Sequence, residues 1–171
     1  MKTSETKVFR IGDPVIYPTH GVGQITGEEV ELIGGIETKL YVISFAKDKM
    51  VLRVPKSRAL KTGLRHLSSE KDFANVISVL RSAAKMNKNM WSKRAQEYEQ
   101  KINSGDIKLI AEVVRDLYRQ ISDQERSYSE KLIYDAALDR LAREYAVASG
   151  MELDVAKEKI ISILQDYRIA E

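Results

Sequence analysis

The sequence predicts an α+β protein of two domains, in which a small, strongly bent antiparallel β-barrel precedes a compact bundle of about five helices. Up to about residue 60, short runs rich in Val, Ile and Thr alternate with Gly and Pro turn signals. Beyond residue 67, the spacing of apolar residues changes from about two to about 3.6. The 171 residues, 43% hydrophobic and 31% charged, suffice for two small folded domains. We place the boundary between domains 1–62 and 63–171.

The first domain contains four or five candidate strands. Residues 13–18 form an extended run bounded by prolines, and residues 24–33 partly alternate polar and apolar side chains. The second run ends at Gly34-Gly35, a two-residue hairpin signal, which predicts return strands over 37–46 and then 50–54. A flat sheet of this size would leave open edges and one wet apolar face, so we expect a bent sheet or small barrel.

The second domain contains five segments with helical spacing. Ser69 and Asp72 resemble a capping box, with Asp in place of Glu, at the start of the first segment. Gly105 is placed to end the second segment in a left-handed conformation, and Asp106 is placed to cap the third. Short loops between such segments are typical of a helix bundle. The expected segments are 69–80, 91–102, 106–121, 129–150 and 154–167.

Charge is distributed unevenly along the chain. Residues 1–102 carry 18 basic and 11 acidic side chains, whereas residues 103–171 carry 10 and 14. A local cationic patch is a hypothesis for binding nucleic acid or an anionic surface, although a solvated face is the plainer interpretation. The sharpest excess, without any acidic residue, consists of Arg81, Lys85, Lys88, Lys93 and Arg94.

The single tryptophan, Trp91, lies within this cationic stretch. On one interpretation it is a core residue, because it shares a helical face with Tyr98 and Ile102. On the other, the indole is a wedge that partly unstacks a base step in the minor groove while Lys93 and Arg94 neutralise phosphates. Five cations give a slope of about −4 to −5 at most for the logarithm of the DNA-binding constant against the logarithm of the salt concentration. Binding by this domain alone is therefore weak, and the domain needs a second binding contact.

Enzymatic and metal chemistry have few candidate residues. The only histidines, His20 and His66, are expected to be turn or packing residues, and there is no nucleophile elbow, Walker loop or paired-carboxylate pattern. Gly21, Gly23 and Gly27 superficially resemble a dinucleotide fingerprint but lead into a strand, so we expect them to permit a bulge or sheet corner. We therefore predict no catalysis, cofactor or metal.

Two further features bear on location. The chain has no cysteine, which suits a reducing cytoplasm. No apolar run approaches the roughly 18 residues that a membrane span needs, and the first residues lead into no signal-type apolar region. We expect a cytoplasmic protein without a membrane partner. The absence of a long heptad pattern favours a monomer.

Seven short motifs follow one another along nearly the whole chain: Phe9-Arg-Ile-Gly-Asp-Pro-Val-Ile-Tyr-Pro18, His20-Gly-Val-Gly23, Leu52-Arg-Val-Pro55, Gly63-Leu-Arg65, Trp91-Ser-Lys-Arg94, Ser104-Gly-Asp106 and Ala111-Glu-Val-Val-Arg-Asp-Leu117. In this order they resemble the CarD family of bacterial RNA-polymerase-binding transcription regulators. The resemblance implies a Tudor-like N-terminal domain, shared with transcription-repair coupling factor, that docks on the polymerase β subunit. It also implies a helical domain that touches promoter DNA at the upstream edge of the transcription bubble.

The resemblance also assigns roles to individual residues. Trp91 corresponds to a tryptophan that enters the minor groove, and Lys93 and Arg94 to basic residues beside it. Arg53 corresponds to an arginine that contacts the β subunit, and Ile33 to an apolar contact on the same surface. Some relatives have a basic residue near the end of the second strand, where this chain has acidic side chains at Glu28, Glu29 and Glu31.

The function that we expect is tethered wedging by a non-catalytic regulator of transcription initiation. Docking raises the local concentration of the helical domain at promoter DNA, where Arg81, Lys85 and Lys88 add phosphate contacts. The wedge then stabilises the open complex without sequence-specific readout, and a preference of about 1.4 kcal/mol for opened DNA shifts the equilibrium tenfold. Two alternatives stay open: a protein-interaction adaptor in which Trp91 is core, and a stand-alone nucleic-acid-binding module.

Overall fold

The computed structural model describes residues 9–85, 88–118 and 127–169. The chain divides into two compact units, the sheet unit (Met1–His66) and the helical unit (Leu67–Glu171), each with its own hydrophobic core. The predicted two-domain α+β organisation is confirmed. The division follows His66 rather than residue 62, because Arg65 and His66 form a short strand that pairs with the first strand of the sheet.

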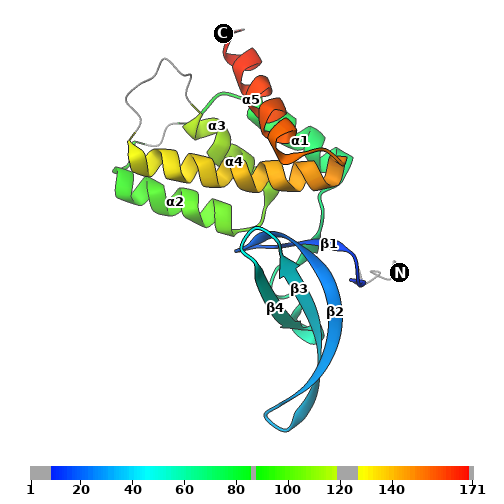
Figure 1. Cartoon of the computed structure of the whole chain (residues 1–171). Coiled ribbons are helices and arrows are strands. Elements are labelled where there is room, and N and C mark those ends of the chain that lie inside the picture. The colour runs from blue at the N-terminus through cyan, green and yellow to red at the C-terminus, as the bar shows by residue number, and fades with distance from the viewer. Residues whose placement is uncertain (1–8, 86–87, 119–126, 170–171) are drawn as a thin grey trace, which may run out of the picture. The chain divides into compact units, whose positions relative to one another are not determined.

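The sheet unit is a five-stranded antiparallel sheet with the strand order β4-β3-β2-β1-β5 (Figure 1). Its strands are β1 (Pro14–Tyr17), β2 (Gly21–Ile33), β3 (Ile36–Phe45), β4 (Met50–Pro55) and β5 (Arg65–His66), with a 3-10 turn at Lys56–Arg58. The sheet is bent but open, with β4 and β5 as its edges, and does not close into the expected barrel. Phe9, Ala59 and Leu64, from segments outside the strands, contribute to its core instead of a closing strand pair.

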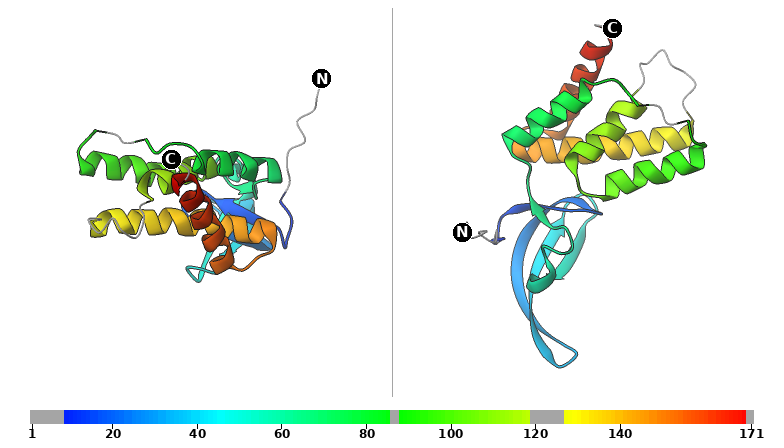
Figure 2. Two further views of the ribbon diagram at one scale, coloured as in Figure 1. Left: turned by 90° about the horizontal axis from the view of Figure 1, so that it is seen from above. Right: turned by 180° about the vertical axis from the view of Figure 1, so that it is seen from behind.

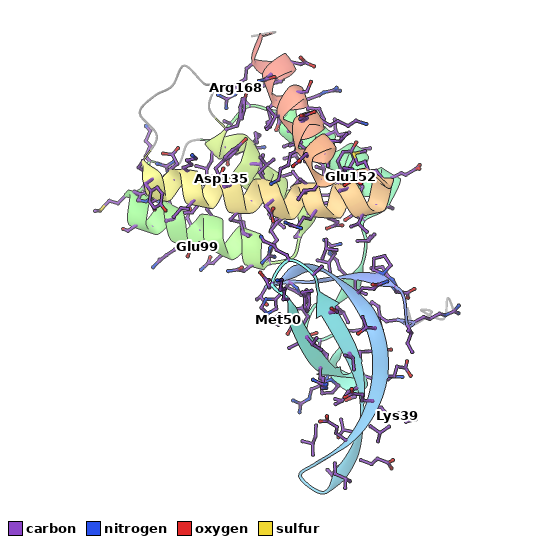
Figure 3. All side chains as sticks on the ribbon, in the orientation of Figure 1. Lys39, Met50, Glu99, Asp135, Glu152 and Arg168 are labelled. Atoms are coloured by element: carbon purple, nitrogen blue, oxygen red, sulfur yellow. The ribbon has the colours of Figure 1, made fainter. Side chains whose placement is uncertain are left out.

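The β2–β3 hairpin is the longest part of the sheet. Gly34 and Gly35 have φ angles of 59° and 79°, which only glycine adopts readily, and Ile33 pairs with Ile36 across this turn as the sequence predicts. β1 pairs with β2 only as far as Gln24, and β4 pairs with β3 only from Leu40 onward, so the part of the hairpin distal to Leu40 is a two-stranded ribbon. Lys39 marks this ribbon in Figure 3.

The two histidines are packing residues, as predicted. The His20 ring lies 5.5 Å from the rings of both Tyr17 and Phe45, measured between centroids. The His66 ring stacks on Phe9 at 4.6 Å. Both imidazoles therefore extend the aromatic packing of the sheet unit.

The helical unit contains the five expected helices in its described part: α1 (Glu70–Leu80), α2 (Trp91–Asn103), α3 (Ile107–Leu117), α4 (Tyr128–Ser149) and α5 (Leu153–Ile169). The predicted capping box is present, since Ser69 and Asp72 exchange hydrogen bonds between side chain and backbone. Asp106 caps α3 as predicted. Residues 119–121, which the sequence assigns to the same helix, lie outside the described residues.

The 22-residue α4 is the centre of the bundle, because α2, α3 and α5 all pack against it (Figures 1 and 2). Ser127 caps its first turn, and Gly150, with a φ of 66°, ends it in the left-handed conformation. Among the residues that the structure describes, no helix combines the length and apolar character needed to cross a bilayer.

Gly23 is required by close packing. A Cβ at this position would lie 2.8 Å from an aromatic carbon of Phe45 and 2.9 Å from a methyl carbon of Ile43. At Gly27 on the same strand, the nearest atom, from Val42, is 3.9 Å away. The bulge of β2 lies between Ile25 and Gly27, so Gly23 serves core packing rather than the bulge.

We therefore expect Gly23→Ala to destabilise the sheet unit by about 1–3 kcal/mol through overpacking. Native-state hydrogen exchange at the amides of β2 and β3 measures this, because it reports the sheet unit separately from the helices. Gly27→Ala is the matched control and should change exchange little. Equal protection in the Gly23→Ala protein and the wild type would contradict the packing argument.

Candidate functional site

The N-terminal ends of α2 and α4 lie together in the helical unit. The two helices run side by side in the same direction (Figures 1 and 2). Trp91 is the first residue of α2, and Ser129 lies in the first turn of α4. The indole Nε1 of Trp91 donates a hydrogen bond of 3.2 Å to Ser129 Oγ. A direct contact between side chains thus joins the two helix starts.

The Trp91 ring is partly buried and packs against the edge of the helical core. Its centroid lies 6.3 Å from the Tyr98 ring, with the two planes inclined at 47°. Met90, immediately before it, is 80% exposed. The ring is therefore neither enclosed in the core nor free in solvent: one part is fixed by packing, and the remainder lies at the surface.

Arg94 is held against these rings. Its guanidinium carbon lies 5.4 Å from the Trp91 centroid and 5.8 Å from the Tyr98 centroid, within cation–π range. Nη2 donates to the Tyr98 hydroxyl at 3.2 Å, while the buried Nε has no hydrogen-bond partner among the described residues. Arg94, which the sequence analysis placed with the phosphate-binding cations, thus lies against the two aromatic rings of α2.

The other four predicted cations are exposed: Arg81, Lys85, Lys88 and Lys93. The first two lie at the start of the connection between α1 and α2, Lys88 lies near its end, and Lys93 lies in the first turn of α2. Three of these cations thus precede Trp91 in the connection, and Lys93 follows it in α2.

A buried ion pair anchors the start of that connection. Asp116 Oδ1 accepts hydrogen bonds from Arg115 Nε at 2.8 Å and from the backbone N–H of Lys85 at 2.9 Å. Arg115 also donates to Ser82 Oγ at 2.8 Å. Both side chains of the ion pair are only 6% exposed. The sequence presented Arg115 and Asp116 only within a family motif, because a helical pattern alone does not show that two adjacent charges are buried.

The sheet unit brings the other two predicted site residues to one face. We call the face that carries Val42 and Arg53 the outer face; the inner face carries Ile43. The bulge between Ile25 and Gly27 moves Gly27 onto the outer face opposite Val42, so Ile33 lies there too. Arg53 pairs with Val42, and Ile33 pairs with Ile36. Because Ile36 and Val42 are six positions apart on β3, the two predicted contacts lie about 20 Å apart along the sheet.

The same bulge places Glu29 and Glu31 on the outer face, where they meet Arg53. Arg53 Nε donates to Glu29 Oε2 at 2.8 Å and lies 3.9 Å from Glu31 Oε1, with all three side chains between 41% and 49% exposed. The hydrogen bond that Arg53 donates to Glu29, together with the charge of that carboxylate, raises the pKa of Arg53. On the other face, Glu28 pairs with Lys56 at 2.8 Å. The acidic residues that distinguish this chain are thus intramolecular partners of basic ones.

The distal hairpin exposes apolar side chains. Ile33 is 50% exposed, and its cross-strand neighbour Ile36 is 71% exposed. Leu32, on the opposite face of the ribbon, is 77% exposed. The sequence identified Ile33 alone; Leu32 and Ile36 were missed because nothing in the strand pattern shows that this part of the hairpin extends beyond β1 and β4.

The chain thus joins a sheet unit with exposed charged and apolar side chains to a helical unit with exposed cations near a partly buried tryptophan. Residues 9–68 match the CarD-like/TRCF RID domain, and residues 75–161 match the CarD, C-terminal domain. The chain belongs to the CarD family, which confirms the resemblance seen in the sequence. It is accordingly a transcription regulator.

The similar proteins include one relative and one solved structure. YdeB of Bacillus subtilis (strain 168), a provisionally assigned transcription factor, is 29% identical over 144 residues, which cover 84% of this chain and 94% of YdeB. The solution NMR structure of the 72-residue N-terminal domain of Myxococcus xanthus CarD is 27% identical. That match covers 39% of this chain and 88% of the Myxococcus domain, with a TM-score of 0.32.

The ion pair at the start of the cationic connection gives a stability prediction. Asp116→Ala would leave Arg115 buried without its carboxylate, which we expect to destabilise the helical unit by about 3–5 kcal/mol. Urea unfolding followed by the fluorescence of Trp91 reports this unit specifically, since the chain has one tryptophan. The control is Asp135→Ala on the exposed side of α4, which should change stability by less than about 0.5 kcal/mol. Similar unfolding midpoints for both variants would refute the anchoring role.

Proposed function

We propose that this protein docks on the RNA polymerase β subunit through the outer face of its sheet unit and stabilises the promoter open complex. The helical unit inserts Trp91 into the minor groove at the upstream edge of the bubble. The family match over residues 9–68 to a domain named for both CarD and TRCF supports the docking step. No base-specific contact is needed for this function.

The observation that best supports insertion of Trp91 into the minor groove is the position of this residue at the start of α2. An intercalating side chain has to combine a firm attachment with an apolar surface that can reach a base step. The ring is attached through Ser129 and Arg94, and it is only partly buried. A ring deep in the core could not reach DNA, and an unattached ring would lose more rotamer freedom on insertion.

The surrounding charge supports weak, sequence-independent binding. Four exposed cations can neutralise at most four phosphates, which gives a salt slope of about −3.6. Such binding is feeble as a bimolecular contact, but docking of the sheet unit makes it intramolecular at a high effective concentration. The helical unit therefore acts only where polymerase has already placed it.

On the docking face, Arg53 and Ile33 supply one charged and one apolar contact about 20 Å apart. Glu29 and Glu31 already neutralise Arg53, so a carboxylate of the partner has to compete with them. A partner surface that also offers a cation to Glu29 or Glu31 would satisfy all three side chains. This charge pattern favours a partner with mixed charge over a purely acidic one.

The mechanism requires no chemical step. A ligand shifts a two-state equilibrium by its difference in affinity for the two states and by no more. If Trp91 contacts opened DNA more favourably than closed duplex by about 1.4 kcal/mol, the ratio of open to closed complexes rises tenfold.

A protein-interaction adaptor is the second candidate, favoured by the part of the Trp91 ring that packs against the helical core. In an adaptor, Trp91 supports the fold and the helical unit binds another protein. The two candidates differ in what loss of the indole does at the promoter.

Trp91→Ala should leave polymerase docking intact and remove the stabilisation of the open complex. The reason is that docking resides in the sheet unit, whereas the wedge is the indole itself. A promoter-melting assay with polymerase measures the effect, and co-purification with the β subunit together with circular dichroism shows that docking and fold persist. Undiminished melting by the folded, docked variant would favour the adaptor.

Arg53→Glu should weaken binding to the β subunit by at least about tenfold, because it puts a third carboxylate beside Glu29 and Glu31 and removes the cation. Pull-down with isolated β-subunit fragments measures it. Lys39→Glu makes the same charge change on the inner face of the ribbon, and that variant should bind normally. If both variants bind alike, the outer face is not the docking surface.

A further inference from the structure

The indole N–H of Trp91 is already used within the protein. Tryptophan has one hydrogen-bond donor and no acceptor, and that donor points to Ser129 Oγ at 3.2 Å. The partner lies on another helix, so the bond fixes the ring relative to α4 as well as α2. The geometry of this pair thus constrains the side chain on which the proposed function depends.

The ring is restrained from two directions. Arg94 and Tyr98 contact it from α2, with centroid distances of 5.4 Å and 6.3 Å respectively. Ser129 contacts its N–H edge from α4. The Ser129 hydrogen bond thus adds a polar contact from α4 to the packing of the ring against the helical core.

The Ser129 hydroxyl is itself well placed for this role. It lies in the first turn of α4, which Ser127 caps by accepting a hydrogen bond from the N–H of Glu130 at 3.2 Å. Glu130 is buried, so this turn is part of the packed bundle rather than a frayed end. Ser129 itself is exposed, and the packing of its neighbour Glu130 holds the turn that carries the acceptor.

We propose that Ser129 is a positioning residue that holds the Trp91 indole in the orientation in which it meets DNA, an inference that rests on the proposed function. Ser129 does not touch the nucleic acid in this role. Its hydrogen bond selects one ring orientation before binding, so less rotamer freedom is lost when the ring inserts.

The same bond limits what the ring can recognise. The minor groove offers acceptors at A·T pairs, adenine N3 and thymine O2, and a free indole N–H could donate to them. With its donor bound to Ser129, Trp91 presents only apolar ring surface. Insertion then depends on how easily a base step unstacks, which accounts for a wedge without base-specific contacts.

The test compares Ser129→Ala with Ser129→Thr, which keeps the hydroxyl, and with Ser92→Ala, which removes an exposed hydroxyl next to Trp91. Since Trp91 is the only tryptophan, acrylamide quenching and fluorescence anisotropy of the free protein report this ring alone. Ser129→Ala should increase quenching and lower anisotropy, and it should shorten the lifetime of the open complex about fivefold, the effect of one neutral hydrogen bond. Ser129→Thr and Ser92→Ala should behave like the wild type.

Unchanged quenching and anisotropy in Ser129→Ala would overturn the positioning role. So would altered fluorescence of Trp91 in this variant without a change in open-complex lifetime. The third contradicting outcome is a Ser129→Thr protein whose ring fluorescence or open-complex lifetime differs from that of the wild type. Circular dichroism and β-subunit pull-down verify that each variant is folded and docks. Failure of the proposed function has a different signature, in which Trp91→Ala leaves the open-complex lifetime unchanged while Ser129→Ala still alters the fluorescence of the ring.

Discussion

The parallel packing of α2 and α4, with their N-terminal ends together, is the constraint on which the functional surface depends. It puts Trp91 at the edge of the helical core, where one part of the ring packs and another stays accessible. It also brings Ser129 within hydrogen-bonding distance of the indole, although 38 positions separate the two residues.

The elements of the fold follow from short-range signals that the sequence displays. The capping box at Ser69 and the left-handed pair Gly34-Gly35 act within a few residues, so both were predictable, as was the order of strands and helices. The open sheet was not predicted, since coverage of the inner face by Phe9 and Leu64 is a tertiary arrangement that no strand pattern displays. β5 was uncertain because a two-residue strand has no period of its own.

The proposed functional surfaces were predictable in composition but not in geometry. Helical spacing placed Trp91 and Tyr98 on one face, yet it could not show that Arg94 lies against both rings instead of facing solvent. Likewise, Glu29 and Glu31 were visible as a departure from relatives, but only the bulge of β2, which reverses the faces of the strand, brings them to Arg53. Both contacts join residues through packing and register, which one-dimensional patterns do not encode.

The central claim is that Trp91 contacts opened promoter DNA more favourably than closed duplex. Its most direct test is the affinity of the protein for two polymerase complexes, one held closed and one assembled on a promoter opened in advance by mismatches. The wild type should bind the opened complex about tenfold more tightly than the closed complex, the ratio that would also raise the proportion of open complexes tenfold. This preference should vanish in Trp91→Ala. Equal affinity of the wild-type protein for both complexes would contradict the claim.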